Sequence, residues 1–331
     1  MTNLTIVVVN YNTRRHLREC LASIVASQRN DARGFGDREA ERKVAEIVVV
    51  DNASSDGSVE MVRADFPQVV LQVNSANLGY GAAANQAIAQ CEADYVLLLN
   101  SDTRLEPGVA GALQSYLDRH PQVAIAGPRL QNPDGTVQAS CYPAPTPLNL
   151  FLEESRLGRL AAHIPGLRQR YLRTWRHDKV KAVPWVLGAV LAIRRDAFIA
   201  VGGFDPAFYM YFEEIDLCRR LWAKGWHIHF APVGTVVHFG GASTDQHYAQ
   251  MQAQLFESTQ LFYARHYSRG QAWLLRLLMI PVLVARLVQD TVRYARARTT
   301  PQRERSSDML QVRYRLLRRC LPPPISAARR P

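Results

Sequence analysis

The stretch LLLNSDTRLEPG, at residues 97–108, places a lone acid three positions after three consecutive leucines. Unbroken apolar runs of this kind indicate strands that are buried on both faces, as in a parallel sheet. Such a strand delivers the polar residues that follow it to a crevice beyond the carboxyl end of the sheet. The acid is Asp102, and the position two before it, where a second carboxylate would complete a metal clamp, is Asn100. Two interpretations stay open: a metal site with one charge missing, or a strand that ends in a polar turn.

Outward from this stretch, short apolar runs alternate with segments of helical periodicity. Because crossovers between parallel strands are right-handed, the alternation predicts an α/β fold with a doubly wound, mostly parallel sheet and helices on both faces. The expected strands are residues 4–9, 46–50, 69–73, 95–99 and 123–126, and the expected helices are residues 14–27, 57–65, 80–91 and 107–119. Later we expect a strand within 185–195, a helix that ends at Gly225, short strands at 227–232 and 235–239, and a helix over 246–267.

Polar residues follow four of these strands at the point where each strand ends. Since the carboxyl ends of parallel strands share one edge of a sheet, these residues should line a single crevice. The chain contains no GxGxxG or GxxxxGK[ST] motif, which argues against dinucleotide-binding and P-loop proteins. The polar segments are Asn10 to Asn12, Asp51 to Gly57, Asn74 to Gly81 and Asn100 to Asp102.

A second group of acids, Glu213, Glu214 and Asp216, lies at the start of an expected helix, among aromatic residues. Acids at this position are favoured by the helix dipole, which is one explanation of the group. Apolar surroundings also raise the proton affinity of a carboxylate, so the group could instead supply a general base. A third candidate is His238, which ends a short strand before Gly240 and Gly241; it is either structural or a ligand.

Charge is distributed unevenly along the chain. The formal net charge is +11, and the stretch from Arg265 to the end holds 15 Arg and 3 acids, a balance of +12. A tail of this kind binds phosphates of lipid or of nucleic acid. The five cysteines show no CxxC spacing, which favours a reducing compartment over a disulfide framework or a zinc site. The first apolar run is too short for a signal peptide and is expected to be the first strand.

The tail itself contains an apolar stretch at residues 271–298. Its charge-free run, between Arg276 and Arg286, is nine residues long, far below the ~20 needed to span a bilayer. With Pro281 inside this run, we expect a pair of interfacial helices on anionic lipid; the alternative is a packing helix with a solvated basic face. Beyond residue 299 we expect one short helix, 309–319, and a disordered end. Residues 156–181, rich in basic groups, are expected to form a mobile, acceptor-facing flap.

Six motifs, in order, resemble the inverting members of glycosyltransferase family 2, with the GT-A fold, and in particular the rhamnosyltransferase-like branch. The resemblance covers residues 3–265 and rests on TIVVVNYN, VVVDNASSDGS, NLGYGAAANQA, LLLNSD, GGFDPAFYMYFEEIDLCRRLWAKGW and HFGG. It implies transfer of a sugar, with rhamnose from dTDP-rhamnose as the best guess and a UDP-sugar as the alternative. The acceptor would be a glycan or a lipid-linked sugar in cell-envelope polysaccharide synthesis.

The resemblance also implies an organisation of the chain. Residues 1–265 would form the glycosyltransferase domain, with a nucleotide-sugar-binding half at 1–126 and an acceptor and catalytic half at 127–265. Residues 266–331 would form a basic, membrane-associating tail. The enzyme would be cytoplasmic and peripheral at the inner face of the cell membrane.

Roles carry over from the family residue by residue. Asp102 and His238 would hold a divalent metal ion, Mg²⁺ or Mn²⁺, and Glu214 would be the general base, with Glu213 and Asp216 orienting the base or the acceptor. Asn100 departs from the family's D-x-D pattern and brings no charge, so metal should bind weakly until the donor's diphosphate arrives. The residues expected to hold the nucleotide-diphosphate sugar are Asn10, Tyr11, Asn12, Asp51, Asn52, Ser54, Asn77, Gly79, Gly81, Asn85, Asn100 and Ser101.

Two other classes of protein remain as alternatives. A nucleotidyltransferase also places acids at strand ends, but its first loop should be rich in glycine, and NYNTRRH has none. A nucleic-acid binder could use the basic tail. It would not need the polar crevice, and residues 1–264 carry no net positive charge, so we expect no nucleic-acid partner.

Overall fold

The computed structural model describes residues 3–34, 44–155, 157, 175–242, 246 and 248–320. Most of the segment expected to be a flap, and the expected disordered end beyond residue 320, lie outside these residues. The chain divides into two compact units, Met1–Pro143 with Tyr171–Gln246, and Ala144–Arg170 with His247–Pro331. We expected a boundary between residues 265 and 266, but the chain passes into the second unit at His247. The helix expected over residues 246–267 therefore belongs to the second unit.

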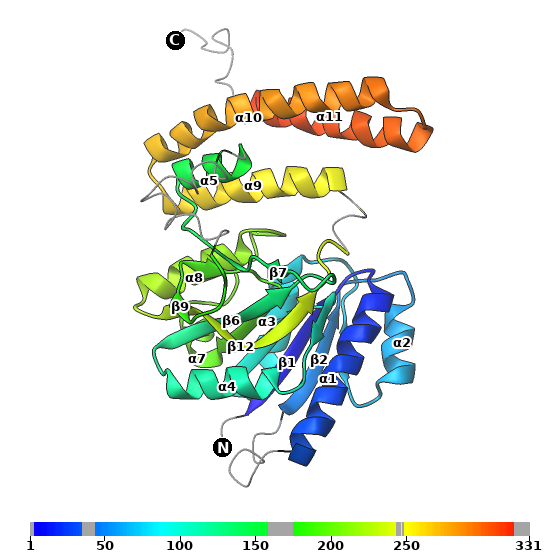
Figure 1. Ribbon diagram of the computed structural model, residues 1–331, viewed down its shortest axis with the longest axis vertical. Helices are drawn as coiled ribbons and strands as arrows, with labels where there is room; N and C mark the ends of the chain where they lie inside the picture. Colours follow the sequence, from blue (N-terminus) through cyan, green and yellow to red (C-terminus); the bar gives the residue numbers. More distant parts are fainter. Residues whose placement is uncertain are drawn as a thin grey trace. The chain divides into compact units, whose positions relative to one another are not determined.

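The first unit is built around one large mixed sheet (Figure 1), in which neighbouring strands follow the order β3-β2-β1-β4-β11-β6-β12-β5. The strands β1 to β4 run parallel, as predicted, whereas β11 runs antiparallel to β4 and β6 in the middle of the sheet. The strands on this path are β1 (Leu4–Asn10), β2 (Val44–Asp51), β3 (Val70–Val73), β4 (Tyr95–Asn100), β5 (Thr103–Leu105), β6 (Val123–Gln131), β11 (Val190–Arg194) and β12 (His227–His238). Short strands complete the unit: β7 (Val137–Gln138), β8 (Cys141–Tyr142), β9 (Lys181–Ala182) and β10 (Trp185–Val186).

Helices cover both faces of the sheet, which explains why its central strands read as unbroken apolar runs. Along β1, Ile6 and Val8 pack into the core on one face, while Val7 and Val9 pack into the core on the other. The first core includes α1 (Arg14–Gly34), α2 (Ser58–Asp65) and α4 (Val109–Arg119). The second includes α3 (Tyr80–Gln90), α7 (Arg195–Ala200) and α8 (Glu213–Ala223).

Two expected short strands form a single strand, β12, because the segment HIHFAPVGTVVH continues through Pro232 and Gly234. Its pairing with β6 shifts register between Phe230 and Thr235, so the proline falls in an irregularity rather than at a break. Pro is tolerated at such positions because no ladder hydrogen bond is required there.

The second unit is helical, with α5 (Pro147–Glu154), α9 (Tyr248–His266), α10 (Arg269–Arg296) and α11 (Thr300–Cys320). α10 packs against α5, α9 and α11. Two predictions were wrong here. α10 is one helix that passes through Pro281 rather than a helix pair, and α11 begins nine residues before the expected residue 309. Among the described residues, only α10 has the length and apolar composition that crossing a membrane requires, which is weak evidence by itself.

Candidate active site at the carboxyl edge of the sheet

The carboxyl ends of β1 and β2 bring the first two predicted residues together. Strand register places Asn10 opposite Asp51. The Asn10 amide donates to Asp51 Oδ2 at 2.8 Å and to Ser54 Oγ at 3.1 Å. Asp51 Oδ1 accepts from the Ser54 amide at 2.8 Å. Both side chains at the strand ends are buried, so this network fixes the carboxyl ends of β1 and β2 relative to each other.

The loops beyond these strands are held in unusual backbone conformations. Asn12 and Ala53 have positive φ, 51° and 65°, which costs a non-glycine residue about 1–3 kcal/mol. The Asn12 amide donates to Ser54 Oγ at 2.9 Å, and Asn12 Oδ1 accepts from the Ser55 amide at 2.8 Å. The two strained loops therefore support each other. Tyr11 lies half-buried beside them.

Asn52 organises the loop before α3. Its amide donates to the Gly79 carbonyl at 3.1 Å, and its Oδ1 accepts from Asn74 at 2.9 Å. Asn77 Oδ1 accepts from the Gly79 amide at 3.0 Å. Gly79 has φ of 87°, and a Cβ there would lie 2.2 Å from the Tyr209 carbonyl oxygen. Only glycine permits this approach, which joins the loop to the segment that precedes α8.

Asn85 and Gly81 face that same segment rather than a strand end. The Asn85 amide donates to the Phe204 carbonyl at 2.8 Å, and its Oδ1 accepts from the Phe204 amide at 2.9 Å. A Cβ on Gly81 would lie 2.9 Å from Phe204 Cβ. The structure thus gives both residues a role in docking residue 204 onto α3.

The residues after β4 connect to the network of β1. Thr13 Oγ1 donates to Asn10 Oδ1 at 2.7 Å and lies 2.7 Å from Ser101 Oγ. Because the single hydroxyl proton of Thr13 is engaged by Asn10, Ser101 donates to Thr13. The Asn100 side chain is half-buried, and its backbone is fixed by hydrogen bonds with Ala189 at 2.9 Å and Thr103 at 2.7 Å.

Asp102 and His238, the two predicted metal ligands, are neighbours. His238 Nε2 lies 3.4 Å from Asp102 Oδ1, because β12 pairs with β5 and sets His238 beside Thr103. Burial opposes ionisation of Asp102, but the hydrogen bond and charge of His238 and the Ala242 amide outweigh it and lower the pKa of the carboxyl group. His238 Nδ1 lies 2.8 Å from Gln138 Oε1. In the described part of the chain, no three acids, histidines or cysteines form a metal-binding cluster.

Glu213 and Glu214 begin α8 in a buried, strained setting. Tyr211 and Phe212, directly before them, both have positive φ, 65° and 69°. Burial raises the pKa of Glu214, and burial together with the charge of Glu214 raises that of Glu213 well above its usual range. Within the described residues, Oε2 of each has no hydrogen-bond partner. A buried carboxylate oxygen without a hydrogen-bond partner is energetically costly. Each Oε2 atom could therefore accept a hydrogen bond from a hydroxyl group of a ligand.

Asp216 has a different environment from the two glutamates. It accepts from Arg220 Nε at 2.7 Å. Arg220 also donates to the carbonyls of Val201 at 2.6 Å and Gly203 at 2.7 Å. The geometry therefore makes Asp216 a residue that positions α8 against the turn at residues 201–203.

Tyr80 links the two acidic groups, and the sequence analysis did not single it out. Its hydroxyl donates to the Gly188 carbonyl at 2.9 Å. Burial, followed by the charges of Glu213, Glu214 and Asp102, raises its pKa well above the usual value. The negative charges of all three acids therefore act on this one phenol. The motif NLGYG contains this tyrosine, but its partner is 108 residues away in the chain.

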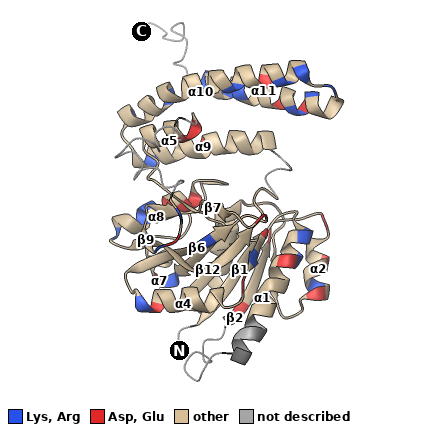
Figure 2. Cartoon of the chain, in the orientation of Figure 1, with Lys and Arg blue, Asp and Glu red and all other residues tan. Residues whose placement is uncertain are grey.

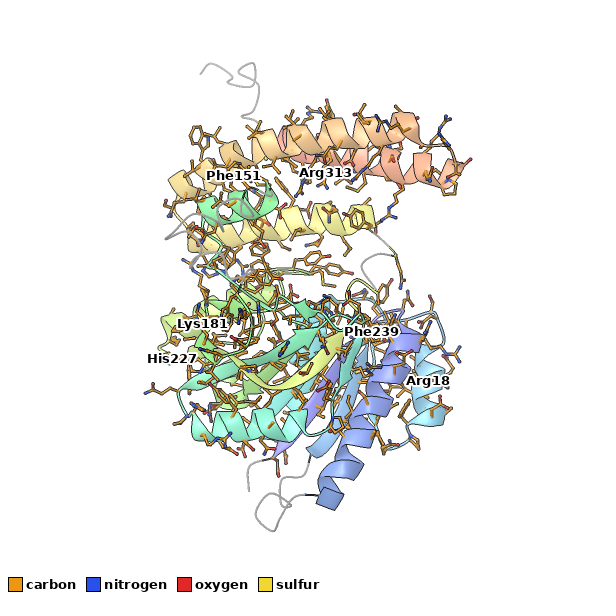
Figure 3. All side chains as sticks on the ribbon, in the orientation of Figure 1. Arg18, Phe151, Lys181, His227, Phe239 and Arg313 are labelled. Carbon is orange, nitrogen blue, oxygen red and sulfur yellow. The ribbon has the colours of Figure 1, made fainter. Side chains whose placement is uncertain are left out.

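Three other residues of the site were also missed: Thr13, Gln138 and Gly188. Their contacts depend on residues distant in sequence, and nothing in their local pattern indicated them. Gly188 lies against Glu214, since a Cβ built on it would be in ordinary contact, 3.6 Å, with the Glu214 side chain. Phe239, which Figure 3 labels, follows His238 and packs its ring against His16 with centroids 4.9 Å apart.

Comparison with known proteins agrees with this geometry. The profile of glycosyl transferase family 2 matches residues 5–174, and that of glycosyl transferase family group 2 matches residues 170–315. An N-acetylglucosaminyl-diphospho-decaprenol L-rhamnosyltransferase of Mycobacterium tuberculosis is 31% identical over 280 residues, which is 80% of this chain and 85% of that protein.

Two solved structures share the fold. One is the mannosyltransferase PcManGT from Pyrobaculum calidifontis in complex with GDP-Man and Mn²⁺, with a TM-score of 0.54 and 17% identity over 96% of this chain and 86% of that chain. The other is GalNAc-T7 with UDP, GalNAc and Mn²⁺, with a TM-score of 0.50 and 16% identity over 80% of this chain and 50% of that chain. The chain therefore has the GT-A fold and belongs to glycosyl transferase family 2, as a rhamnosyltransferase-like glycosyltransferase.

Proposed function

We propose that the protein is an inverting, metal-dependent glycosyltransferase that moves rhamnose from dTDP-rhamnose to a lipid-linked sugar in cell-envelope polysaccharide synthesis, at the cytoplasmic face of the membrane. The observation that carries the mechanism is the buried Glu214 carboxyl group, whose Oε2 has no partner within the described residues. The choice of donor and acceptor is supported by the mycobacterial relative, whose name states both a rhamnosyl group and a diphospho-decaprenol acceptor.

Glu214 is assigned as the general base because it is the more easily ionised member of the glutamate pair. Backbone amides around Glu214, including that of Gly188, oppose the effect of burial on its pKa. For Glu213, burial and the charge of its neighbour act together in the same direction. Glu214 therefore ionises first and takes the proton of the acceptor hydroxyl as that oxygen attacks the anomeric carbon. The raised pKa of Glu213 favours its neutral form, which would limit the negative charge beside the base.

Asp102 and His238 fit a divalent ion as a carboxylate and an imidazole whose facing atoms are 3.4 Å apart. Two ligands from the protein leave positions open for diphosphate oxygens. When bound, the metal ion would offset the charge of the departing nucleoside diphosphate. Asn10, Asp51 and Ser54 would hold the base and ribose of the donor, with Tyr11, Asn12, Asn52, Asn77, Gly79, Asn100 and Ser101 at its borders.

The test is a transfer assay with dTDP-, UDP- and GDP-sugars, Mn²⁺ or Mg²⁺, and a short-chain lipid diphosphate that carries N-acetylglucosamine. We expect rhamnosylated product from dTDP-rhamnose, with the anomeric configuration inverted as judged by NMR. Glu214→Gln should lower kcat about 10²–10⁴-fold while donor binding, measured by thermal shift, persists. Glu46→Gln, at an exposed carboxylate, is the control.

Three results would contradict separate parts of the proposal. Near-normal transfer by Glu214→Gln would remove the assigned base. Full activity after chelation would remove the metal ion. Product formed only from a UDP-sugar would leave the reaction class in place and change the donor.

A further inference from the structure

The helix α10 presents a long apolar face that the second unit leaves uncovered. Trp273, Leu277, Val284 and Val288 are exposed, with Trp273 at 60% and Val288 at 58%. Their spacing of four, seven and four residues places them on one side of a helix. From Trp273 to Val292 this face extends over about 28 Å. Exposed apolar surface of this extent marks an interaction site or a membrane contact.

No charged residue interrupts this face. The helix has three charged residues between positions 270 and 292, namely Arg276, Arg286 and Asp290. Arg276 donates to Gln260 on α9 at 2.9 Å, and the other two form ion pairs with α5 and α11. All three therefore bond to partner helices, although Arg276 is itself exposed, and no charged residue stands among Trp273, Leu277, Val284 and Val288 on this face.

An ion-pair network fastens the opposite face of α10 to its neighbours. Arg286 binds Glu154 of α5 at 2.6 Å. Asp290 is buried and pairs with Arg313 of α11 at 3.6 Å. Arg313 in turn donates to Gln252 of α9 at 3.3 Å, and Figure 3 shows it on the side of α11 that faces α9. If α10 crossed a bilayer alone, it would carry these charges into hydrocarbon without their partners, which costs several kcal/mol.

Basic residues lie at both ends of the helix and along α11 (Figure 2). Arg269 begins α10 and Arg296 lies in its last turn, and both are exposed; Arg293, also in the last turn, pairs with Asp290 at 3.2 Å. Long basic side chains beside an apolar face extend toward headgroup phosphates while their stems cover apolar surface. An uncharged face bordered by arginines is complementary to the interface of an anionic bilayer.

We propose that α10 lies flat in the interface of an anionic phospholipid bilayer. The side that carries Trp273, Leu277, Val284 and Val288 would be buried at the acyl boundary, and the ion-paired side would be held against α5, α9 and α11. This surface lies outside the residues assigned to donor, metal and base, so the proposal stands or falls separately from the assigned reaction.

The first experiment measures binding of the full chain to vesicles by flotation. We compare phosphatidylcholine alone with phosphatidylcholine containing 30% phosphatidylglycerol, at 0.1 M and 0.5 M salt. The double variant Val284→Gln, Val288→Gln should bind the anionic vesicles at least about tenfold more weakly, because two apolar side chains are lost from the interface. Ile199→Gln is the matched control, since Ile199 is an equally exposed apolar residue (50%) on α7. Wild-type binding should be weak without the anionic lipid and weaker at high salt.

The second experiment locates the helix in the bilayer. Of the five tryptophans, only Trp273 is exposed, so brominated lipids should quench tryptophan emission in the wild type and much less in Trp273→Phe. Alkaline carbonate should release the protein from vesicles, as expected for a helix in the interface. Circular dichroism checks that each variant is folded.

Three outcomes would overturn the proposal. Equal vesicle binding by the wild type and the double variant would show that this face does not contact lipid. Resistance to carbonate extraction would show that α10 spans the bilayer. A wild type that dimerises without lipid, and becomes monomeric in the double variant, would assign the face to a second copy of the chain.

Discussion

Glu213 and Glu214 are neighbours in sequence, and both are almost fully buried. This burial makes the free energy of unfolding depend on pH. The folded-state pKa of each carboxyl group is raised above its ordinary value. The fold therefore favours the neutral form of the pair. The resulting contribution to the free energy of unfolding is fully present below the unfolded-state pKa of about 4.3. This contribution is lost as the pH rises through the folded-state pKa values.

Glu213→Gln removes one of these ionisations, so it should raise the free energy of unfolding at pH 8 relative to the wild type and change it little at pH 4.5. Urea unfolding at the two pH values measures the difference. Glu46→Gln, at an exposed position, controls for charge. If Glu213→Gln destabilised the protein more at pH 8 than at pH 4.5, the raised pKa would be refuted.

Gln138 determines how His238 faces Asp102. The Gln138 amide nitrogen donates to Asn132 Oδ1 at 2.9 Å, so its Oε1 is directed at His238 Nδ1 and accepts a hydrogen bond from the Nδ1–H group. This arrangement leaves Nε2 as the nitrogen that faces Asp102, and it would bind a metal ion once the ion displaces its proton.

Gln138→Leu should weaken Mn²⁺ binding in the presence of dTDP about 10–100-fold, as measured by electron paramagnetic resonance. Donor binding without metal should change little. The control is Gln131→Leu, whose amide makes only the local contact with Gly135 in the same hairpin. Unchanged Mn²⁺ affinity in Gln138→Leu would argue against His238 as a ligand.

At the level of elements, two glycines in the first unit differ in whether a side chain could replace their hydrogen. Gly79 precedes α3 with positive φ and has no room for a Cβ, whereas Gly111 lies inside α4 with nothing within 4 Å of the position a Cβ would take. Gly79→Ala should destabilise the protein by about 1–3 kcal/mol, since the strain cannot be relieved without moving Tyr209.

Gly111→Ala should stabilise the protein by about 0.5–1 kcal/mol, because it replaces a glycine in a helix interior. Thermal unfolding of the two variants beside the wild type gives both signs in one experiment. A Gly79→Ala variant as stable as the wild type would show that residues 79 and 209 do not make this contact.

Elements that follow from local pattern were predicted well from the sequence, and those that depend on tertiary context were not. β4 was predicted because Leu97 and Leu99 pack on one face of the sheet and Leu98 on the other, which produces an unbroken apolar run. α10 was predicted as two helices because Pro281 removes a backbone hydrogen bond. Packing against three other helices keeps the parts of α10 on either side of Pro281 in one helix. That packing cannot be predicted from the local sequence.

The candidate site divides in the same way. Asn10, Asp51 and Asp102 were identified because each follows a strand, and strand ends meet at one edge. Tyr80, Gln138 and Gly188 were missed because their partners are brought to them only by the fold. The antiparallel direction of β11 was also missed, since a short apolar strand carries no indication of the direction in which it pairs.

At the scale of the whole molecule, the two units should respond separately to loss of the buried ion pair in the second. Asp290→Asn leaves Arg313 buried without its charge partner, and breaking such a pair costs about 3–5 kcal/mol. Hydrogen exchange followed by mass spectrometry should show faster exchange in α5, α10 and α11, with β1, β2 and β4 unchanged.

Asp308→Asn, at an exposed position on α11, is the control and should leave exchange unaltered. Faster exchange throughout both units would show that they unfold together.

The course of the chain through the two units has a consequence for synthesis. The second unit takes residues 144–170 from the middle of the sequence and the rest from residue 247 onward. α5 ends at residue 154, and its partner α10 begins at residue 269, so the ribosome adds 114 residues between them. At a translation rate of ~5–20 residues per second, roughly 6–23 s pass between the synthesis of α5 and the start of α10. During this interval the apolar side of α5 is available to chaperones, and a protein shortened at residue 246 would keep it uncovered permanently.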